Sequence, residues 1–351
     1  MNKKQDLLAM TIDELELIMD TIGEKTYRAK QLFSWLHKGV LSFDQMTNIP
    51  KSTREKLSRN FYITHLKELK QLNSRDGLTT KYLYLLPDDN IIECVVMEYS
   101  YGTTLCLSTQ VGCKMGCSFC ASTKAGLIRD LTAGEMLAQV LYVNKALLEK
   151  EKKAIRGLVL MGSGEPLDNY NNTLKFLQLV HDPQGLNIGY RNITLSTCGL
   201  VPEIRALAEE GLSINLAVSL HAPNDSIRGK IMRVGRAYRK KDIIDACSFY
   251  FKKTGRRITF EYAMINKIND KLDHAKELAN LLKGFPCHVN IIPLNQVKES
   301  ELKRSNNESV QAFIKILEEK GVQVTRRREM GADVDGACGQ LRSTFIAEKQ
   351  K

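Results

Sequence analysis

The chain has 351 residues, of which 43% are hydrophobic and 26% are charged, and its formal net charge is +11. This composition excludes collagen, a long coiled coil and a disordered chain, and the length suits one large α/β unit with an appendage or two domains. The positive charge favours a polyanionic partner without identifying it. Since no apolar run approaches the ~20 residues of a membrane helix and the first residues do not resemble a secretion signal, we expect a cytoplasmic protein with no membrane partner.

The first part of the chain, residues 1–95, is predicted to be a small, mainly helical accessory domain that ends in a short β-linker. Thr11 and Glu14 have the spacing of a capping box, and Tyr27–Leu36 repeats apolar residues at helical spacing. A further short helix is expected after Pro50. Two later segments alternate like paired strands around an Asp-Asp-Asn turn, namely Thr79–Tyr84 and Ile91–Tyr99.

Residues 96–333 are predicted to form the core of an α/β protein, because strands and helices alternate there, and residues 334–351 are predicted to form a C-terminal loop and tail. Strand-like runs lie at Thr104–Thr109, Gly157–Gly162, Asn192–Thr197, Ile214–His221, Arg257–Ile265, His288–Asn295 and Val322–Arg328. Helical runs between them include Thr132–Leu148, Pro202–Glu210, Lys241–Thr254, Lys271–Leu282 and Glu308–Lys320. Thr132 and Glu135 form a second capping box. Such βα units imply a parallel sheet that is closed or partly closed into a (βα)6 barrel, with functional residues at the carboxyl ends of its strands.

The chain holds nine cysteines, an odd number that argues against a disulfide framework and for thiols kept for metal or redox chemistry. Cys113, Cys117 and Cys120 form a C-x3-C-x2-C triplet directly after the first barrel strand. Such a triplet can hold three irons of a [4Fe–4S] cluster and leave the fourth iron open to another ligand. A structural zinc ion would instead need a fourth protein ligand nearby. Other cysteines are expected to be buried apolar side chains, namely Cys94, Cys198, Cys247 and Cys287.

The triplet followed by this βα pattern resembles the radical S-adenosylmethionine (SAM) superfamily. The resemblance implies a partial (βα)6 barrel in which the open iron binds SAM, and an electron from the cluster splits SAM to give a 5′-deoxyadenosyl radical. It also implies that SAM is bound by residues at the strand ends, namely Gly164, Glu165, Ser196, Ser219, Leu220, His221 and Asn295. Without the resemblance, the glycine-rich turn and the strand-end serines have ordinary structural roles, and His221 is a core histidine.

Further segments resemble one family within that superfamily, the RlmN/Cfr family of RNA methyltransferases. These segments are Arg28–Gln31 with Trp35, Phe43–Pro50, Gln110–Cys113 and Gly331–Leu341. The resemblance implies methylation of carbon 2 of an adenosine in the peptidyl-transferase region of 23S rRNA, and in many members also of the adenosine 3′ to the tRNA anticodon. It further implies a flavodoxin or a ferredoxin as electron donor, and we favour a monomer.

The family resemblance also assigns three catalytic residues, and two SAM molecules are used in each turnover. Cys338 takes a methyl group from the first SAM and becomes S-methylcysteine, which the radical from the second SAM activates for addition to the adenine ring. Cys106 then attacks the Cys338 sulfur and releases the RNA through a transient disulfide, while Glu93 accepts the proton from carbon 2. From the residues alone, Cys106 is a buried strand cysteine and Glu93 is a carboxylate on a strand surface.

Two alternative functions stay open from the sequence. A Cfr-type enzyme uses the same cysteines to methylate carbon 8 of the same adenosine, and a non-catalytic iron–sulfur or zinc protein would bind RNA as a ribosome assembly factor without turning over SAM. Residues 232–235 read Met-Arg-Val-Gly, whereas the family commonly has Met-Pro-Ile-Asn or Met-Pro-Val-Asn. The difference falls in the loop after the fourth strand. Basic clusters such as Arg326–Arg328, and Arg28, Lys30 and Lys38 beside Trp35, are candidate RNA contacts.

Overall fold

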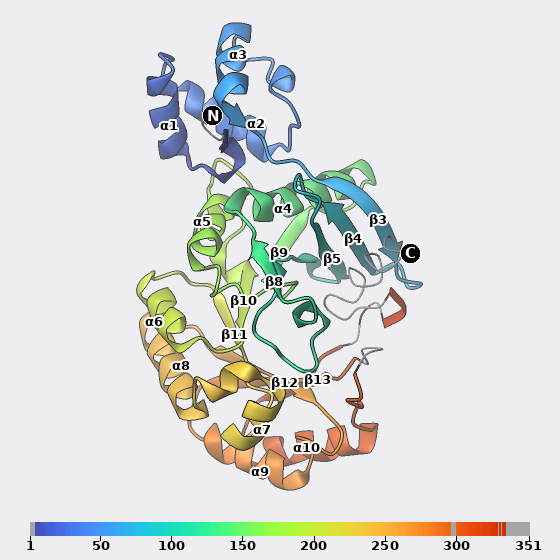
Figure 1. Cartoon of the computed structure of the whole chain (residues 1–351). Helices are drawn as coiled ribbons and strands as arrows, with labels where there is room; N and C mark the ends of the chain where they lie inside the picture. The colour runs from blue at the N-terminus through green and yellow to red at the C-terminus, as the bar shows by residue number, and fades with distance from the viewer. Residues whose placement is uncertain (1–3, 296–299, 329, 331, 335–351) are drawn as a thin grey trace.

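The computed structural model describes residues 4–295, 300–328, 330 and 332–334. A helical N-terminal unit, blue in Figure 1, stands beside a larger α/β unit. Cys338 and the rest of the segment 335–351 lie outside the described residues. Every helix in the described part of the chain is too short or too polar to cross a membrane.

The N-terminal unit is built from three helices that bury one face each. Its elements are α1 (Ile12–Thr21), α2 (Arg28–His37), α3 (Lys51–Asn60), the 3-10 turns η1 (Leu7–Ala9) and η2 (Phe43–Gln45), and the short parallel strands β1 (Gln5–Asp6) and β2 (Phe61–Tyr62). The predicted capping box is confirmed, since Glu14 N donates to Thr11 Oγ1 and Thr11 N donates to the Glu14 carboxylate at 2.8 Å. The unit meets the α/β unit through η1, which contacts helices α4 (Ala133–Glu149) and α5 (Tyr170–His181).

A ten-stranded sheet runs through the larger unit in the order β14-β13-β12-β11-β10-β9-β6-β5-β4-β3. Its parallel strands are β6 (Gly102–Cys106), β9 (Ile155–Leu160), β10 (Ile193–Thr197), β11 (Asn215–Ser219), β12 (Ile258–Met264), β13 (Cys287–Pro293) and β14 (Val324–Arg326). The six predicted barrel strands and the final strand are therefore confirmed, with bounds that are shifted or shortened by a few residues. They curve into a partial barrel (Figure 1).

The rest of the sheet is antiparallel. The predicted hairpin is confirmed as β4 (Thr79–Leu85) and β5 (Ile91–Tyr99), and β5 continues across the predicted domain boundary to pair with β6. The edge strand β3 (Lys67–Asn73) was not predicted. The β-linker is therefore part of the barrel sheet.

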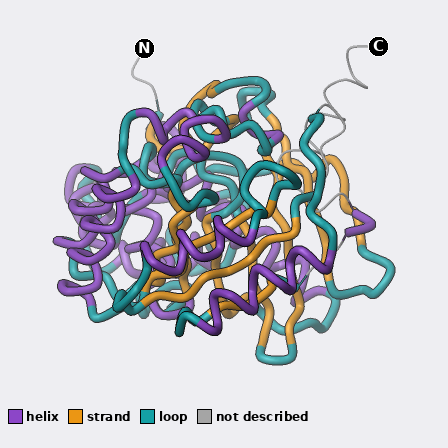
Figure 2. The backbone as a smooth tube through the Cα atoms, turned by 90° about the horizontal axis from the view of Figure 1, so that it is seen from below, coloured by secondary structure: helices purple, strands orange, loops and turns teal. Residues whose placement is uncertain are grey.

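The remaining helices cover the outer face of the sheet. They are α6 (Val201–Glu209), α7 (Asp225–Ile231), α8 (Lys240–Thr254), α9 (Leu272–Leu281) and α10 (Asn307–Glu319). Seen from below, the row of strands is flanked by helices (Figure 2). The predicted capping box of α4 is confirmed, because Glu135 N donates to Thr132 Oγ1 at 3.1 Å.

The apolar core lies between the sheet and these outer helices. Strand residues such as Leu158, Leu195, Phe260 and Val289 are at most 1% exposed. Because side chains alternate along a strand, the residues between them face the interior of the barrel. That inner face is where the polar and ionisable strand residues gather.

Candidate active site

The cysteine triplet lies on a loop that a small hairpin closes. Strands β7 (Gln110–Gly112) and β8 (Leu127–Asp130) pair antiparallel at the base of the loop. Gly112 has φ +79°, and a Cβ there would collide with the Gly126 carbonyl, so only glycine fits this crossing. Cys113 N donates to Gly126 O at 3.0 Å, which ties the first cysteine to the closed end of the loop.

The three thiols suit an iron–sulfur cluster, whose metal core is cationic. Cys113 and Cys117 are buried and Cys120 is half-buried. Burial, together with the charge of Cys120, raises the pKa of Cys113 to about 12, and burial with the charges of Cys120 and Cys113 also raises the pKa of Cys117. Three thiolates that repel one another need a cation, and in a cluster each cysteine binds its own iron. Within the described residues, no three His, Cys, Asp or Glu side chains are grouped as ligands of a single metal ion.

The turn after β9 is tied to the cysteine hairpin. Gly164 has φ +112°, and a Cβ there would lie 2.7 Å from Gln110 N. Glu165 N donates to Gln110 Oε1 at 2.9 Å. Glu165 is 3% exposed, and its carboxylate accepts hydrogen bonds from Cys198 N at 2.6 Å and Leu167 N at 3.1 Å. Burial raises the pKa of Glu165, opposed by hydrogen bonds from Cys198, Thr197 and Leu167.

Ser108, which follows β6, connects three parts of the site. Its Oγ donates to the Glu93 carbonyl at 2.7 Å and accepts from Ser163 N at 3.1 Å. The Gln139 side chain accepts from Ser108 N and donates to Ser108 O, both at 3.0 Å. Ser108 and Gln139 are each 0% exposed. The sequence analysis missed both, because a serine after a strand and a glutamine in a helix give no signal of such a junction.

His221 follows β11 in a fixed orientation. Its φ is +53°, its Nδ1 accepts from Ala263 N at 3.0 Å, and Phe119 of the cysteine loop packs edge-on with a ring-centroid distance of 4.8 Å. Burial, assisted by the charge of Arg228, lowers the pKa of His221 to about 3. The imidazole is therefore neutral, and its Nε2–H is the donor left for a ligand.

The other strand-end residues differ in their surroundings. Ser196 and Ser219 are half-buried near the carboxyl ends of β10 and β11, and Leu220 is buried with its N–H donated to a β12 carbonyl. The prediction that Asn295 ends the sixth strand is wrong. The strand β13 ends at Pro293, which has no N–H to continue the ladder, and Asn295 follows with an exposed side chain.

Glu93 and Cys106 lie on the same inner face of the sheet. Cys106 pairs with Val95, and Glu93 lies two positions before Val95 on β5. Lys81 of β4 forms an ion pair with Glu93 at 3.9 Å, and the two side chains are 1% and 4% exposed. Burial raises the pKa of Cys106 to about 11, opposed by the positive charges of Arg327 and Lys81. The structure thus brings the two predicted residues together beside a buried lysine that the sequence analysis missed.

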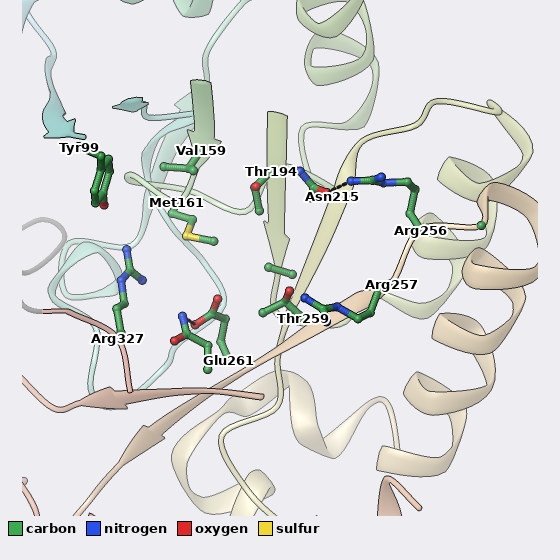
Figure 3. Close-up of a pocket in the computed structure, with 13 residues that line it drawn as sticks. Tyr99, Val159, Met161, Thr194, Asn215, Arg256, Arg257, Thr259, Glu261 and Arg327 are labelled. Atoms are coloured by element: carbon green, nitrogen blue, oxygen red, sulfur yellow. Dashed lines mark hydrogen bonds between the residues drawn. The ribbon is translucent and has the colours of Figure 1, made fainter. Parts of the chain in front are cut away.

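A cavity of about 620 Å³ occupies the barrel interior beside this face (Figure 3). Arg327 points into it near Tyr99 and Glu261 (Figure 3). Asn290 Nδ2 donates to the Glu261 carboxylate at 3.0 Å, and burial raises the pKa of Glu261, opposed by the charge of Arg327. Val159 lines the cavity and pairs with Cys106 on the neighbouring strand, so the cavity adjoins that residue. These cavity residues were not predicted as site residues, although the alternation of side chains along the strands places Glu261 and Asn290 on the inner face.

The cysteine loop, the glycine turn and the strand-end residues define a class of protein that comparison confirms. Residues 107–282 match the family model of the Radical SAM superfamily. The crystal structure of a radical SAM methyltransferase from Sphaerobacter thermophilus is 42% identical, with a TM-score of 0.92, and the match covers 96% of this chain and 98% of that chain. The chain is therefore a radical SAM enzyme that uses a [4Fe–4S] cluster and SAM, as predicted.

The N-terminal unit and the full-length relatives narrow this class. Residues 5–63 match the Ribosomal RNA large subunit methyltransferase N-terminal domain. The probable dual-specificity RNA methyltransferase RlmN of Alkaliphilus oremlandii is 53% identical, and the match covers 98% of this chain and 99% of that protein. The protein of the same name from Clostridium tetani is 51% identical, and the match covers 99% of this chain and 98% of that protein. The chain belongs to the RlmN family of RNA methyltransferases, which confirms the predicted resemblance and argues against a non-catalytic RNA-binding protein.

Proposed function

We propose that this enzyme methylates carbon 2 of an adenosine in the peptidyl-transferase region of 23S rRNA and of the adenosine 3′ to the tRNA anticodon. The observation that carries the proposal is the placement of Cys106 and Glu93 on one inner face beside a cavity of about 620 Å³. An enzyme that modifies a base must take it out of its stack into such a pocket. The volume falls within the ~300–1,000 Å³ typical of small-molecule sites, which suits one nucleoside.

The proposed cofactor site uses the strand ends. Cys113, Cys117 and Cys120 would hold the cluster, which supplies one electron when bound. The Glu165 carboxylate and the turn at Gly164 would receive the amino group of SAM. The remaining SAM contacts would come from Ser196, Ser219, Leu220, His221 and Asn295.

The proposed chemistry of the protein side chains uses two cysteines and one carboxylate. Cys338 carries the methyl group as a thioether, and its activated carbon bonds to carbon 2 of the adenine. Glu93 takes the proton that leaves carbon 2, and the one electron that the adduct must give up would return to the bound cluster. The Cys106 thiolate then attacks the Cys338 sulfur and forms a transient disulfide. The electron pair of the broken sulfur–carbon bond stays on the methylene carbon, which takes a proton and becomes the methyl group of the released RNA. A cellular thiol must reduce that disulfide before the next turnover.

The environment of Cys106 fits a resolving thiol. Burial holds its pKa near 11, so the group rests as an unreactive thiol near neutral pH. The nearby charges of Lys81 and Arg327 stabilise the thiolate once a proton acceptor takes the proton. Glu93, the proposed acceptor of the carbon 2 proton, also interacts electrostatically with Cys106.

The partners proposed for the enzyme follow from the same family. Residues 1–95 would form an accessory RNA-binding domain, in which Lys38 Nζ lies 5.0 Å from the centroid of the Trp35 ring and could meet a phosphate beside an aromatic platform. Residues 96–333 would form the catalytic barrel and 334–351 the loop that carries Cys338. We propose a cytoplasmic monomer that receives electrons from a flavodoxin or a ferredoxin.

Two measurements test the proposal. Mass spectrometry of nucleosides from a host without this protein, before and after the gene is supplied, is expected to show 2-methyladenosine only after supply. Sole formation of 8-methyladenosine would refute the carbon assignment in favour of a Cfr-type reaction. Cys106→Ala is expected to accumulate protein crosslinked to RNA, whereas Cys338→Ala is not, and equal uncrosslinked methylation by both variants would refute the two-cysteine scheme.

A further inference from the structure

The segment that follows β11 packs against the loop that carries the three cysteines and forms a wall beside it. Ser118 N donates to Ile231 O at 2.9 Å, and Ser118 Oγ donates to the same carbonyl at 3.2 Å. Gly116 has φ +67°, and a Cβ there would lie 2.6 Å from Arg233 Cδ. The helix α7 and the 3-10 turn η5 (Arg233–Arg236) therefore pack directly on the loop that carries the three cysteines.

Arg228 is buried inside this wall. The residue is 0% exposed, and its Nη2 donates to Cys198 O at 2.5 Å and to Ser219 O at 3.2 Å. Its Nε and Nη1 are buried and, among the described residues, have no hydrogen-bond partner. A guanidinium cannot release its charge as other basic groups do, so unpaired N–H groups in this position carry a large desolvation penalty. They call for an anionic group that the described residues do not supply at hydrogen-bond distance.

The side chain of Arg228 has little freedom to turn elsewhere. A Cβ on Gly235 would lie 2.9 Å from Arg228 Cγ, and a Cβ on Gly199 would lie 3.2 Å from Arg228 Nη2. Gly199 also has φ +98°, which favours glycine. Gly235 belongs to the segment where the sequence departs from the common family pattern. In this chain, glycines on two sides thus confine the guanidinium.

Cys117 lies on the loop that this wall packs against, one residue before Ser118. Three acidic groups act on the charge of Arg228, namely Cys198, whose effect is the largest, Cys117 and Asp225. Asp225 already accepts Lys240 N at 2.7 Å, and Cys198 is a buried thiol whose pKa is raised well above its ordinary value. Cys117 is therefore the partner that becomes a permanent thiolate when iron is bound.

We propose that Arg228 is a positioning residue that stabilises the negative charge of the iron–sulfur cluster through Cys117 and thereby raises the reduction potential of that cluster. The inference rests on the proposed cluster ligands Cys113, Cys117 and Cys120. A one-electron reduction adds one negative charge to the cluster, and a buried cation favours that charge more strongly than an exposed one. Arg228 would therefore make the cluster easier to reduce by the cellular electron donor.

The test is a redox titration of the anaerobically reconstituted full-length protein in the absence of SAM. Dithionite and mediators set the potential, and the paramagnetic signal of the reduced cluster is recorded. Arg228→Gln removes the buried charge, and Arg228→Lys keeps it. Arg233→Gln is the matched control, because it removes an exposed guanidinium from the same wall.

We expect Arg228→Gln to lower the equilibrium constant for one-electron reduction at least ~10-fold, a shift of about 59 mV to more negative potential. Arg228→Lys should shift it less than half as far, and Arg233→Gln should stay within about threefold because solvent and salt screen an exposed charge. An unchanged potential in Arg228→Gln with a full complement of iron would overturn the proposal, as would an equal shift in Arg233→Gln. The titration is then repeated with SAM, and a shift that appears only in its presence would mean that Arg228 acts on SAM and not on the cluster, which also overturns the proposal.

Two controls keep failure of the variants and failure of the site apart. If Arg228→Gln binds no cluster, the midpoint of thermal unfolding of Arg228→Lys is measured instead, because lysine cannot supply the two unpaired N–H groups. The proposal predicts that Arg228→Lys lowers this midpoint more in the cluster-loaded protein than in the apoprotein. An equal decrease in both forms would overturn the proposal. Unchanged iron content in Cys117→Ala would instead refute the ligand assignment on which the site depends.

Discussion

Replacing Lys81 by methionine should be among the most costly single changes in the barrel sheet. Lys81 and Glu93 lie 3.9 Å apart with 1% and 4% of their side chains exposed. At an effective dielectric constant of about 20, two unit charges at that separation attract by about 4 kcal/mol. Removing one partner of a buried pair takes away the counter-charge of the other, which typically costs about 3–5 kcal/mol. We therefore expect Lys81→Met to lower the free energy of unfolding by about 3–5 kcal/mol at neutral pH.

Urea unfolding of the anaerobic full-length protein, followed by circular dichroism, measures this loss. The double variant Lys81→Met/Glu93→Gln should recover a large part of it, because both charges are then absent. Lys70 on the edge strand β3 is exposed and serves as the control, with Lys70→Met expected to change the free energy by about 0.5 kcal/mol or less. A loss below about 1 kcal/mol for Lys81→Met, or a double variant less stable than the single one, would refute the ion-pair reasoning.

Three further predictions follow from single residues. Burial lowers the pKa of His37 from 6.5 to about 4, so the unfolded chain takes up the proton at a higher pH than the folded protein. We therefore expect the free energy of unfolding to fall by about 2 kcal/mol between about pH 7 and pH 5. Urea unfolding should show this loss in the unmodified protein and not in His37→Gln. Gly164→Ala should weaken SAM binding at least ~10-fold by equilibrium dialysis, whereas Gly211→Ala, which shares a positive φ but meets nothing within 4 Å, should leave SAM affinity unchanged. Gln139→Leu leaves the backbone that it bridges unpaired and should cost about 2–4 kcal/mol in urea unfolding, and a cost below about 1 kcal/mol would contradict that role.

The alternating strands and helices of the barrel could be predicted because each strand is a short apolar run bounded by turn residues. The edge strand β3 could not, since Lys67–Asn73 has leucines at only two positions and is mostly exposed. The first barrel strand was predicted to reach Thr109 but ends at Cys106. Beyond it, Leu107 N still donates to Val159 O at 3.1 Å, and the chain then bends toward the glycine turn, where Thr109 N donates to Ser163 O at 2.8 Å.

Site residues could be predicted where their spacing along the chain indicates the chemistry. They could not be predicted where the fold brings together residues that are distant in sequence. The cysteine triplet is visible as a spacing, whereas Glu93 and Cys106 could be assigned only through the family resemblance. Lys81 looks like an ordinary strand lysine, since nothing in its neighbourhood marks it as 1% exposed. Arg228 likewise lies in a short polar helix of seven residues that was not predicted. Both depend on partners that are distant in sequence.

Lys81 and Arg228 are two cations that the fold buries almost completely, at 1% and 0% exposure, while most of the net charge of +11 can remain on the surface. Each faces an anion with a proposed chemical role, Glu93 in one case and the Cys117 thiolate in the other. If this division is correct, the two cations affect different properties. Lys81→Met should destabilise the fold without moving the cluster potential, whereas Arg228→Gln should move the potential, and a shift of equal size in both variants would mean that the potential responds to general loosening of the barrel.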